Sequence, residues 1–227
     1  MERSRINEAI KEAMTLLDDH NIYLPPFGYW TYGDWKDKEG VHHIKDLMLG
    51  WDVTDFGQGK FDTFGGVLFT LRNGISDRPD IGTPYAEKLI VLKEGQRLPL
   101  HYHKEKTEDI INRSGGLMGI KLYNCLETGQ VDYKTRVQVL CDGREFAADP
   151  GETLYIERGA SITLKPYQYH VFWAETGHGP CILGEVSSIN DDRTDNYNAE
   201  PVSRFTTIEE DVPVAYPLCN ELKELLG

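Results

Sequence analysis

The stretch 95–115 constrains this chain more than any other, because it spaces two histidines and a glutamate regularly between two glycines. Its pattern is G-x5-H-x-H-x4-E-x6-G, with His101, His103 and Glu108 at the three polar positions. On a β-strand alternate side chains share a face, so both imidazoles point the same way and Tyr102 points to the other. Imidazole and carboxylate donors together suit a divalent first-row metal. The sequence therefore predicts a metal site carried on β-structure.

This spacing resembles the first motif of the cupin superfamily, and the resemblance implies a β-barrel that holds one metal ion. The cupin pattern expects one more histidine on a second hairpin, a few residues after a proline. Segment 159–170 fits that role, and His170 is the fourth ligand that the resemblance implies. The segment departs from the common form in three ways. Pro166 stands one position late, Tyr167 replaces the usual turn glycine, and Ala174 replaces a frequent asparagine.

The predicted donor set indicates a catalytic ion. Three imidazoles and one carboxylate leave positions open on an octahedral ion, whereas structural zinc sites are usually closed and tetrahedral. We expect Mn²⁺ first, although Fe²⁺, Co²⁺, Ni²⁺ or Zn²⁺ can occupy the same ligands. The remaining histidines are expected at a helix end, on the surface or in a loop: His20, His42, His43 and His178.

Composition excludes several classes of partner. The 227 residues carry a formal net charge of −13 and a pI near 5.0, which argues against nucleic acid and anionic membranes. No apolar run approaches the roughly 18 residues that a membrane span needs, and the first residues lack the apolar core of a signal peptide. Four scattered cysteines without a C-x-x-C pair favour reduced thiols. We therefore expect a cytoplasmic protein.

The N-terminal part is expected to be helical. Apolar residues recur at helical spacing between Ser4 and His20, which predicts an amphipathic helix that Ser4 is able to cap. A second short helix is expected within 40–49. Aromatic residues between them can bind a sugar face or pack the N-terminal arm over the barrel, and we favour packing. These residues are Phe27, Tyr29, Trp30, Tyr32 and Trp35.

From Trp51 onward the chain alternates short β-prone segments with turn signals. The dipeptide Asn73-Gly74 is predicted to turn the chain after a strand, as are Asp142-Gly143 and the segment 149–151. Strands are expected at 67–71, 86–93, 120–125, 136–141, 153–157, 161–164, 169–174 and 181–188, and a short helix within 218–226. Regular short strands favour a closed sandwich or barrel over alternating β-α units.

The predicted fold is therefore mainly β: a cupin-type β-barrel (a double-stranded β-helix or jelly roll) with an N-terminal helical arm. We expect one cupin domain over residues 1–227. It divides into a helical extension at 1–50, a barrel core at 51–205 and a C-terminal tail at 206–227.

A second, narrower resemblance covers nearly the whole chain. The sequence is similar to the D-lyxose isomerase family at 24–27 (LPPF), 46–57 (DLMLGWDVTDFG), 68–74 (LFTLRNG), 85–88 (YAEK), 108–113 (EDIINR) and 184–192 (GEVSSINDD). The resemblance implies an aldose–ketose isomerase that interconverts D-lyxose and D-xylulose, and commonly D-mannose and D-fructose. It also implies Mn²⁺ dependence and a homodimer.

Such a reaction moves a proton between neighbouring carbons through an enediol, whose developing charge a metal ion can hold. It also needs an acid or base facing the same space. Glu185 is one candidate, because it interrupts an apolar strand and burial tends to raise a carboxyl pKa. Lys88 is the other, placed to polarise an oxygen or relay a proton, although a solvated edge-strand lysine explains it equally well. The sequence does not decide which group removes the C2 proton.

The polar loop 190–196 follows the strand that carries Glu185. Asp192 and Arg193 are expected to hydrogen-bond sugar hydroxyls there, with a plain surface loop as the alternative. Two other functions share the metal motif: an iron-dependent cupin dioxygenase and a non-catalytic sugar-binding cupin. Oxygen consumption separates the first alternative from a redox-neutral isomerase. The second lacks a basic patch or a DNA-binding helix pair.

Overall fold

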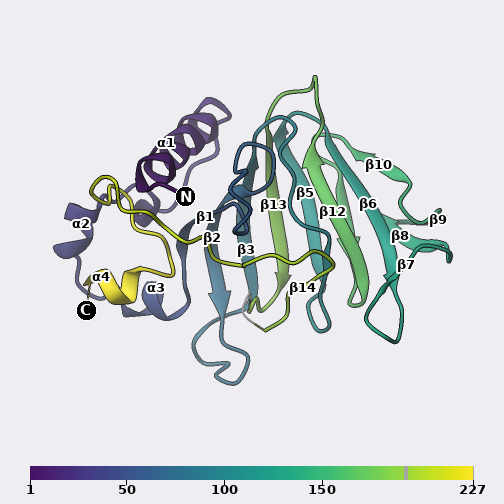
Figure 1. Cartoon of the computed structure of the whole chain (residues 1–227). Coiled ribbons are helices and arrows are strands. Elements are labelled where there is room, and N and C mark those ends of the chain that lie inside the picture. Colours follow the sequence, from purple (N-terminus) through teal and green to yellow (C-terminus); the bar gives the residue numbers. More distant parts are fainter. Residues whose placement is uncertain (192–193, 227) are drawn as a thin grey trace.

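Two curled antiparallel β-sheets face each other and enclose the main hydrophobic interior (Figure 1). The structure is a computed structural model that describes residues 1–191 and 194–226. The larger sheet has the strand order β1-β2-β3-β13-β5-β11-β8-β9, and the smaller has β10-β6-β12-β4-β14 with β7 beside β6. The strands are β1 Gly50–Thr54, β2 Gly66–Gly74, β3 Gly82–Leu92, β4 His101–Tyr102, β5 Glu108–Gly115, β6 Met118–Cys125, β7 Val131–Asp132, β8 Val137–Cys141, β9 Arg144–Ala148, β10 Thr153–Ile156, β11 Ser161–Leu164, β12 Gln168–Ala174, β13 Cys181–Ser188 and β14 Tyr197–Asn198.

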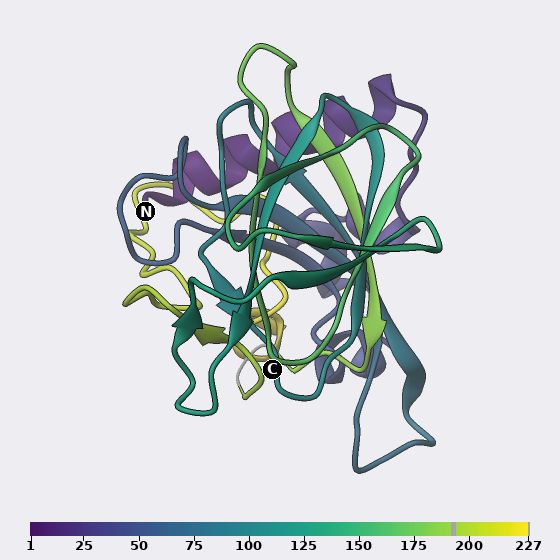
Figure 2. The ribbon, with the colours of Figure 1, turned by 90° about the vertical axis from the view of Figure 1, so that its right-hand side faces the viewer.

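The chain passes back and forth between the two sheets. Strands β10 and β12 belong to the smaller sheet, whereas β11 and β13 belong to the larger. Figure 2 shows the strands of the barrel from the side, crossing one another, with α1 lying behind them. This alternation between the sheets is the jelly-roll topology, and it confirms the predicted cupin-type β-barrel.

Strand alternation fills this interior from both sheets. Leu68 and Ile90 point inward from the larger sheet, and Ile120, Leu122 and Phe172 point inward from the smaller. Each is at most 8% exposed. The interior is therefore apolar except at the end where β4 and the start of β5 lie, and polar side chains there stand out against it.

Helix α1 (Arg3–Asp19) covers the outer face of β1, β2 and β3 (Figure 1). Its apolar stripe includes Ile6, Ile10 and Leu17, and it packs against Trp51 and Phe69 in a second hydrophobic cluster. Because this part of the sheet is buried on both faces, its strands have nearly continuous buried runs. The predicted N-terminal helical arm is confirmed.

The predicted Ser4 cap is wrong. The helix begins at Arg3, and its N-cap residue Glu2 makes no side-chain cap bond. The C-terminal tail supplies the acceptors instead: the Arg3 N–H donates to the Glu209 carbonyl at 2.8 Å, and the Ser4 N–H donates to Asp211 Oδ1 at 2.9 Å. A tertiary contact therefore satisfies the helix end that the sequence assigned to a local cap.

Short helices and aromatic packing complete the N-terminal region. They are the 3₁₀-helix η1 (Pro26–Gly28), α2 (Tyr32–Lys36) and α3 (His42–Asp46), and α4 (Leu222–Leu226) lies near the C-terminus. Phe27 stacks on Phe69 with ring centroids 5.4 Å apart, and Trp35 is buried against Trp30. These contacts favour the packing interpretation of the aromatic residues. None of the helices in the part of the chain described is long and apolar enough to cross a membrane.

The strand predictions hold at 161–164 and 181–188, but the turn predicted at Asn73-Gly74 is wrong. Strand β2 continues to Gly74, which pairs with Gly82, and the chain turns over 75–81. Asn73 stays in the strand because its side chain bonds the backbone of Asn190. Its Nδ2 donates to the Asn190 carbonyl at 2.9 Å, and its Oδ1 accepts the Asn190 N–H at 3.0 Å. A Cβ at position 74 would collide with the Thr83 carbonyl, so close backbone approach is what this glycine permits. The turn at Asp142-Gly143 is confirmed, with both residues at positive φ.

Arg3 ties the helix to the C-terminal tail and provides a test of that attachment. Its guanidinium is buried and pairs with Glu210 at 2.5 Å and with Glu221. We expect Arg3→Ala to lower the free energy of unfolding by about 3 kcal/mol, because it leaves two carboxylates without their buried cation. Arg5→Ala, on the same helix, removes exposed pairs and should lower it by about 0–1 kcal/mol. Urea unfolding of both variants measures the difference, and equal losses would contradict this account.

Candidate metal centre and active site

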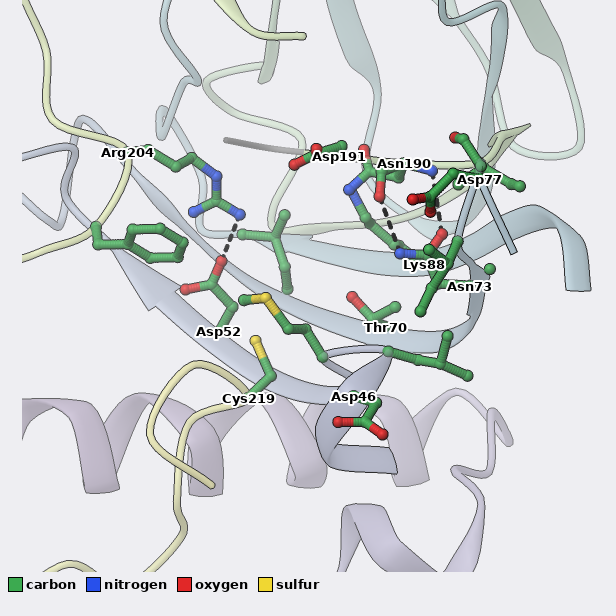
Figure 3. Close-up of a pocket in the computed structure, with 18 residues that line it drawn as sticks. Asp46, Asp52, Thr70, Asn73, Asp77, Lys88, Asn190, Asp191, Arg204 and Cys219 are labelled. Atoms are coloured by element: carbon green, nitrogen blue, oxygen red, sulfur yellow. Dashed lines mark hydrogen bonds and ion pairs between the residues drawn. The ribbon is translucent and has the colours of Figure 1, made fainter. Parts of the chain in front are cut away.

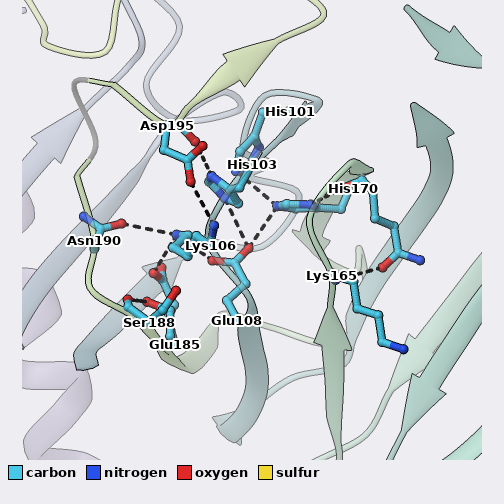
Figure 4. Close-up of polar contacts among 12 residues, drawn as sticks. His101, His103, Lys106, Glu108, Lys165, His170, Glu185, Ser188, Asn190 and Asp195 are labelled. Carbon is cyan, nitrogen blue, oxygen red and sulfur yellow. Dashed lines mark hydrogen bonds and ion pairs between the residues drawn. The ribbon is translucent and has the colours of Figure 1, made fainter. Parts of the chain in front are cut away.

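Two strands of the smaller sheet and the start of one strand of the larger bring four donor side chains together. His101 lies on β4, His103 directly after it, Glu108 at the start of β5 and His170 on β12. One ligand atom from each lies within 4.8 Å of the others (Figure 4). Tyr102 points the other way and stacks on the Tyr197 ring, as strand alternation requires.

Strand pairing fixes the position of His170. It lies directly opposite His101 in the β12–β4 register. Tyr167 takes the place of the usual turn glycine at a φ of +61°, and its N–H donates to the His103 carbonyl at 2.8 Å. Although the second motif departs from its usual form, His170 therefore remains aligned with the histidines of the first motif.

The hydrogen bonds of the three imidazoles fix their tautomers. Each Nδ1 donates to a backbone carbonyl: His101 to Pro99 at 2.9 Å, His170 to Gln168 at 3.1 Å and His103 to Asp195 at 2.5 Å. Each Nε2 consequently presents a lone pair to the centre of the cluster.

These lone pairs face one another. His101 Nε2 and His170 Nε2 are 3.1 Å apart, and Glu108 Oε1 is 3.1 Å from His170 Nε2. His103 Nε2 is buried and has no hydrogen-bond partner in residues 1–191 and 194–226. Acceptors held this close repel unless a cation sits among them. The donor set and its tautomers therefore fit a divalent metal ion.

The electrostatics keep the cluster ready for a cation. Burial, together with His170 and His103, holds the pKa of His101 well below its usual 6.5. Burial alone would raise the pKa of Glu108, but Lys106 and His103 outweigh it and hold this pKa well below its usual 4.5. Near neutral pH the two residues are thus a neutral imidazole and an ionised carboxylate, the forms that bind metal.

Three further charged side chains extend from the cluster. Lys106 Nζ lies 2.7 Å from Glu108 Oε2 and 3.0 Å from Glu185 Oε1, and Lys88 Nζ lies 3.3 Å from the same Glu185 oxygen. Lys88, Lys106 and Glu185 are each at most 5% exposed. The structure thus places Glu185 and Lys88 in contact, as directly opposed residues of β13 and β3, beside the metal cluster.

Sequence reasoning missed Lys106. It stands in the charged run Lys104-Glu105-Lys106, which resembles a solvated loop, and only the turn after His103 folds it inward. Only its position in the sequence could have indicated this. Lys106 stands two residues before Glu108, and on an extended chain side chains two residues apart point the same way.

Asp195 holds this turn in place and was also missed. Its carboxylate accepts the backbone N–H groups of Lys104 at 2.7 Å, Glu105 at 3.3 Å and Lys106 at 3.0 Å. Its own carbonyl accepts the His103 Nδ1–H (Figure 4). One residue therefore fixes both a histidine tautomer and the loop that carries Lys106. The predicted sugar contacts Asp192 and Arg193 lie outside the described residues.

Two cavities open at this end of the barrel. The metal-side cavity, about 50 Å³, is bordered by His101, Lys106, Glu108 and Glu185. The distal cavity, about 530 Å³, lies beside it between β1–β3 and the chain segments that follow β13 and β14 (Figure 3). The site thus combines a cation-binding cluster, buried acid–base groups and space for a small polar molecule.

A jelly roll around three histidines and a glutamate, with buried acid–base groups beside them, defines a cupin with an enzyme-like site. The L-ribose isomerase of Cellulomonas parahominis shares this fold, with a TM-score of 0.59 at 15% identity over 92% of this chain and 98% of that one. The L-ribose isomerase of Geodermatophilus obscurus gives a TM-score of 0.60 at 16% identity over the same shares. At these identities the similarity concerns the fold.

The chain belongs to the D-lyxose isomerase family, whose family model matches residues 1–222. It is 39% identical over 226 residues to the D-lyxose/D-mannose isomerase of Escherichia coli O157:H7, covering 99% of both chains. It is 40% identical over 223 residues to the D-lyxose/D-mannose isomerase of Serratia proteamaculans, covering 97% of both. The chain is thus a sugar aldose–ketose isomerase, which sets aside the dioxygenase and non-catalytic alternatives.

Replacing Asp195 tests its control of the cluster. Asp195→Asn turns an amide nitrogen toward backbone N–H groups, so the turn and His103 should lose their fixed position. We expect Mn²⁺ affinity to weaken about tenfold, as for other residues that orient metal ligands. Asp132→Asn is the matched control, because Asp132 accepts two backbone N–H groups in a distant turn. Chelator competition measures affinity, and an equal weakening in both variants would contradict a specific role.

The pH dependence of metal binding follows from the lowered pKa values. Because the pKa of His101 is held well below 6.5, protons displace a metal from this residue only well below that pH, so Mn²⁺ affinity should stay nearly constant from about pH 8 through about pH 6.5. In the metal-free protein the unfolded chain takes up protons first as the pH falls, through His101 and then Glu108, so stability should decline in the same direction. Titrations of affinity and of urea unfolding from about pH 8 to about pH 5 measure both trends. A decline that is complete by about pH 7 would refute the assignment.

Proposed function

We propose that the chain interconverts D-lyxose with D-xylulose, and D-mannose with D-fructose, in a reaction that depends on a divalent metal, Mn²⁺ by preference. The support for these sugars is the name shared by two relatives of about 40% identity. The support for the metal is the facing pair of Nε2 lone pairs, 3.1 Å apart. This contact is the observation that carries the proposal.

In this proposal His101, His103, Glu108 and His170 hold the ion. When bound, it would supply a Lewis acid that stabilises the negative charge developing on the sugar oxygens. Mn²⁺ suits a site of mixed imidazole and carboxylate donors with open positions.

Glu185 is the proposed acid–base group at carbon. Its carboxylate lines the metal-side cavity next to Glu108, so it faces the space where the C1–C2 edge has to lie. It takes the proton from C2 to give the enediol, and then returns a proton to C1. The two neighbouring lysines, Lys88 and Lys106, hold this carboxylate in position.

Lys106 is the proposed proton carrier between the oxygens. Its Nζ lies within 3.0 Å of both Glu108 and Glu185, so it stands between the metal cluster and the proposed base. It donates a proton to O1 as the enediol forms and accepts the O2 proton as the ketose forms. The C2 proton thus ends on C1 and the O2 proton ends on O1, which balances the isomerisation. Lys88 binds Glu185 from the other side and helps to hold it in place.

The wider setting is part of the proposal. Residues 1–227 form one cupin domain, with the barrel at 51–205, and act as a cytoplasmic homodimer on small sugars. The acidic net charge of −13 supports the absence of nucleic acid and membrane partners. The homodimer rests on the family resemblance, as do the sugar contacts of Asp192 and Arg193.

Solvent deuterium exchange at C2 tests the proposal. The chelated protein should exchange no C2 hydrogen of D-lyxose, and added Mn²⁺ should restore exchange with or without oxygen. Glu185→Gln should lower kcat by about 10²–10⁴ while Mn²⁺ affinity stays close to wild type, because general acid–base catalysis contributes that much.

Glu87→Gln is the control for this variant. Glu87 lies on the same strand as Lys88 and forms an exposed pair with Arg72, so its replacement should leave kcat unchanged. The proposal fails if metal-loaded protein binds D-lyxose yet exchanges no C2 hydrogen over hours.

A further inference from the structure

A row of polar side chains leads from the metal cluster into the distal cavity. On the inner face of the larger sheet, Glu185 lies directly opposite Lys88, and Lys88 lies directly opposite Thr70. These neighbours on β13, β3 and β2 interrupt an otherwise apolar interior. On the same face of the sheet, Leu68 lies next to Thr70 and pairs with Asp52 on β1. The carboxylate of Asp52 extends the polar surface to the edge of the sheet.

The metal-side cavity is too small for a whole sugar. Its volume of about 50 Å³ accommodates only a few water molecules. A pentose has more heavy atoms than this space can hold. A five- or six-carbon aldose whose C1–C2 edge lies at the cluster must therefore extend beyond it. The distal cavity offers about 530 Å³, and Leu68, Lys88 and Arg204 border both cavities.

One wall of the distal cavity, which reaches the metal-side cavity at Arg204, carries a preorganised hydrogen-bonding pair. Arg204 Nη2 donates to Asp52 Oδ2 at 2.6 Å, and Asp52 is only 4% exposed (Figure 3). A guanidinium fixed by a buried carboxylate loses little entropy when it binds a further oxygen. Thr70 adds a hydroxyl to the floor of the same cavity, between Arg204 and the Asn190 loop in the view of Figure 3.

We propose that the distal cavity is a subsite for the far end of an open-chain aldose, with Arg204, held by Asp52, and Thr70 as the groups that recognise its terminal hydroxyls. The inference rests on the proposed function and extends it to substrate length. The carbonyl end lies at the cluster, the chain follows the polar row past Lys88, and the last carbons occupy the distal cavity. The subsite therefore selects aldoses of five or six carbons over shorter ones.

Sugar length is the variable that tests the subsite. We would measure kcat/KM on D-erythrose, D-lyxose and D-mannose for wild type, Arg204→Lys and Thr70→Val. Each variant should lose about tenfold or more on the five- and six-carbon sugars, the loss expected when a hydrogen bond to a charged or buried group is removed. Thr70 lines the distal cavity and not the metal-side cavity, so Thr70→Val should lose less than twofold on the four-carbon sugar, and Arg204→Lys should lose less on that sugar than on the longer ones. Equal losses on all three sugars, or no loss on any, would overturn the subsite.

Two matched controls separate the subsite from general damage. Arg97→Lys alters a comparable arginine, paired with Glu200 at 2.9 and 3.0 Å, that borders neither cavity. Thr153→Val makes the same change on β10, away from the site. Neither control should change the preference for sugar length.

Binding of D-arabinitol, a five-carbon polyol that cannot isomerise, gives a second measurement that does not require turnover. Its Kd for the Mn²⁺-loaded protein should rise about tenfold in Arg204→Lys and stay unchanged in Arg97→Lys. An unchanged Kd in Arg204→Lys overturns the subsite whatever the kinetics. If wild type binds the polyol but exchanges no C2 hydrogen of any aldose, the proposed function fails instead, so the two failures are distinguishable.

Discussion

The site depends on one cross-strand pair. His101 and His170 lie opposite each other on β4 and β12, and their Nδ1 atoms are both occupied by backbone carbonyls. Two acceptor nitrogens are consequently held 3.1 Å apart in a buried space. The fold supplies the energy for this arrangement through the surrounding sheet pairing, and a bound cation is the chemical means of relieving it. A shift of one residue in either strand would turn one imidazole to the opposite face and dismantle the cluster.

The neighbouring charges are arranged to limit the cost of burial. Glu108, Lys106, Glu185 and Lys88 alternate in sign, and each contacts the next at 2.7 to 3.3 Å. Isolated charges in such an interior would change their protonation state, whereas alternating ones stabilise each other. The same alternation serves chemistry, because it keeps a carboxylate and an ammonium within reach of one small space.

Local sequence patterns predicted the parts of the structure that depend on local geometry. Strand alternation accounts for the shared direction of His101 and His103, and helical spacing accounts for the buried stripe of α1. The family motif indicated His170 despite the tyrosine at its turn. The other features depend on contacts between distant segments. Asp195 caps a turn some 90 positions earlier in the chain, and Asn73 remains in a strand because of Asn190. Spacing along the chain cannot reveal such partners, and Lys106 was missed for the same reason.

The C-terminal tail has two attachments that lie close together in sequence. Thr206 bonds Asp55 beside the distal cavity, at 2.8 and 3.0 Å, directly after Arg204 has contributed to the cavity wall. A few residues later, Glu209 and Glu210 secure the first turn of α1. Detachment of this tail would expose the helix end and breach the wall together. We therefore expect the N-terminal helix and the cavity rim to unfold locally as one cooperative unit, with their amide hydrogens exchanging in a shared opening event.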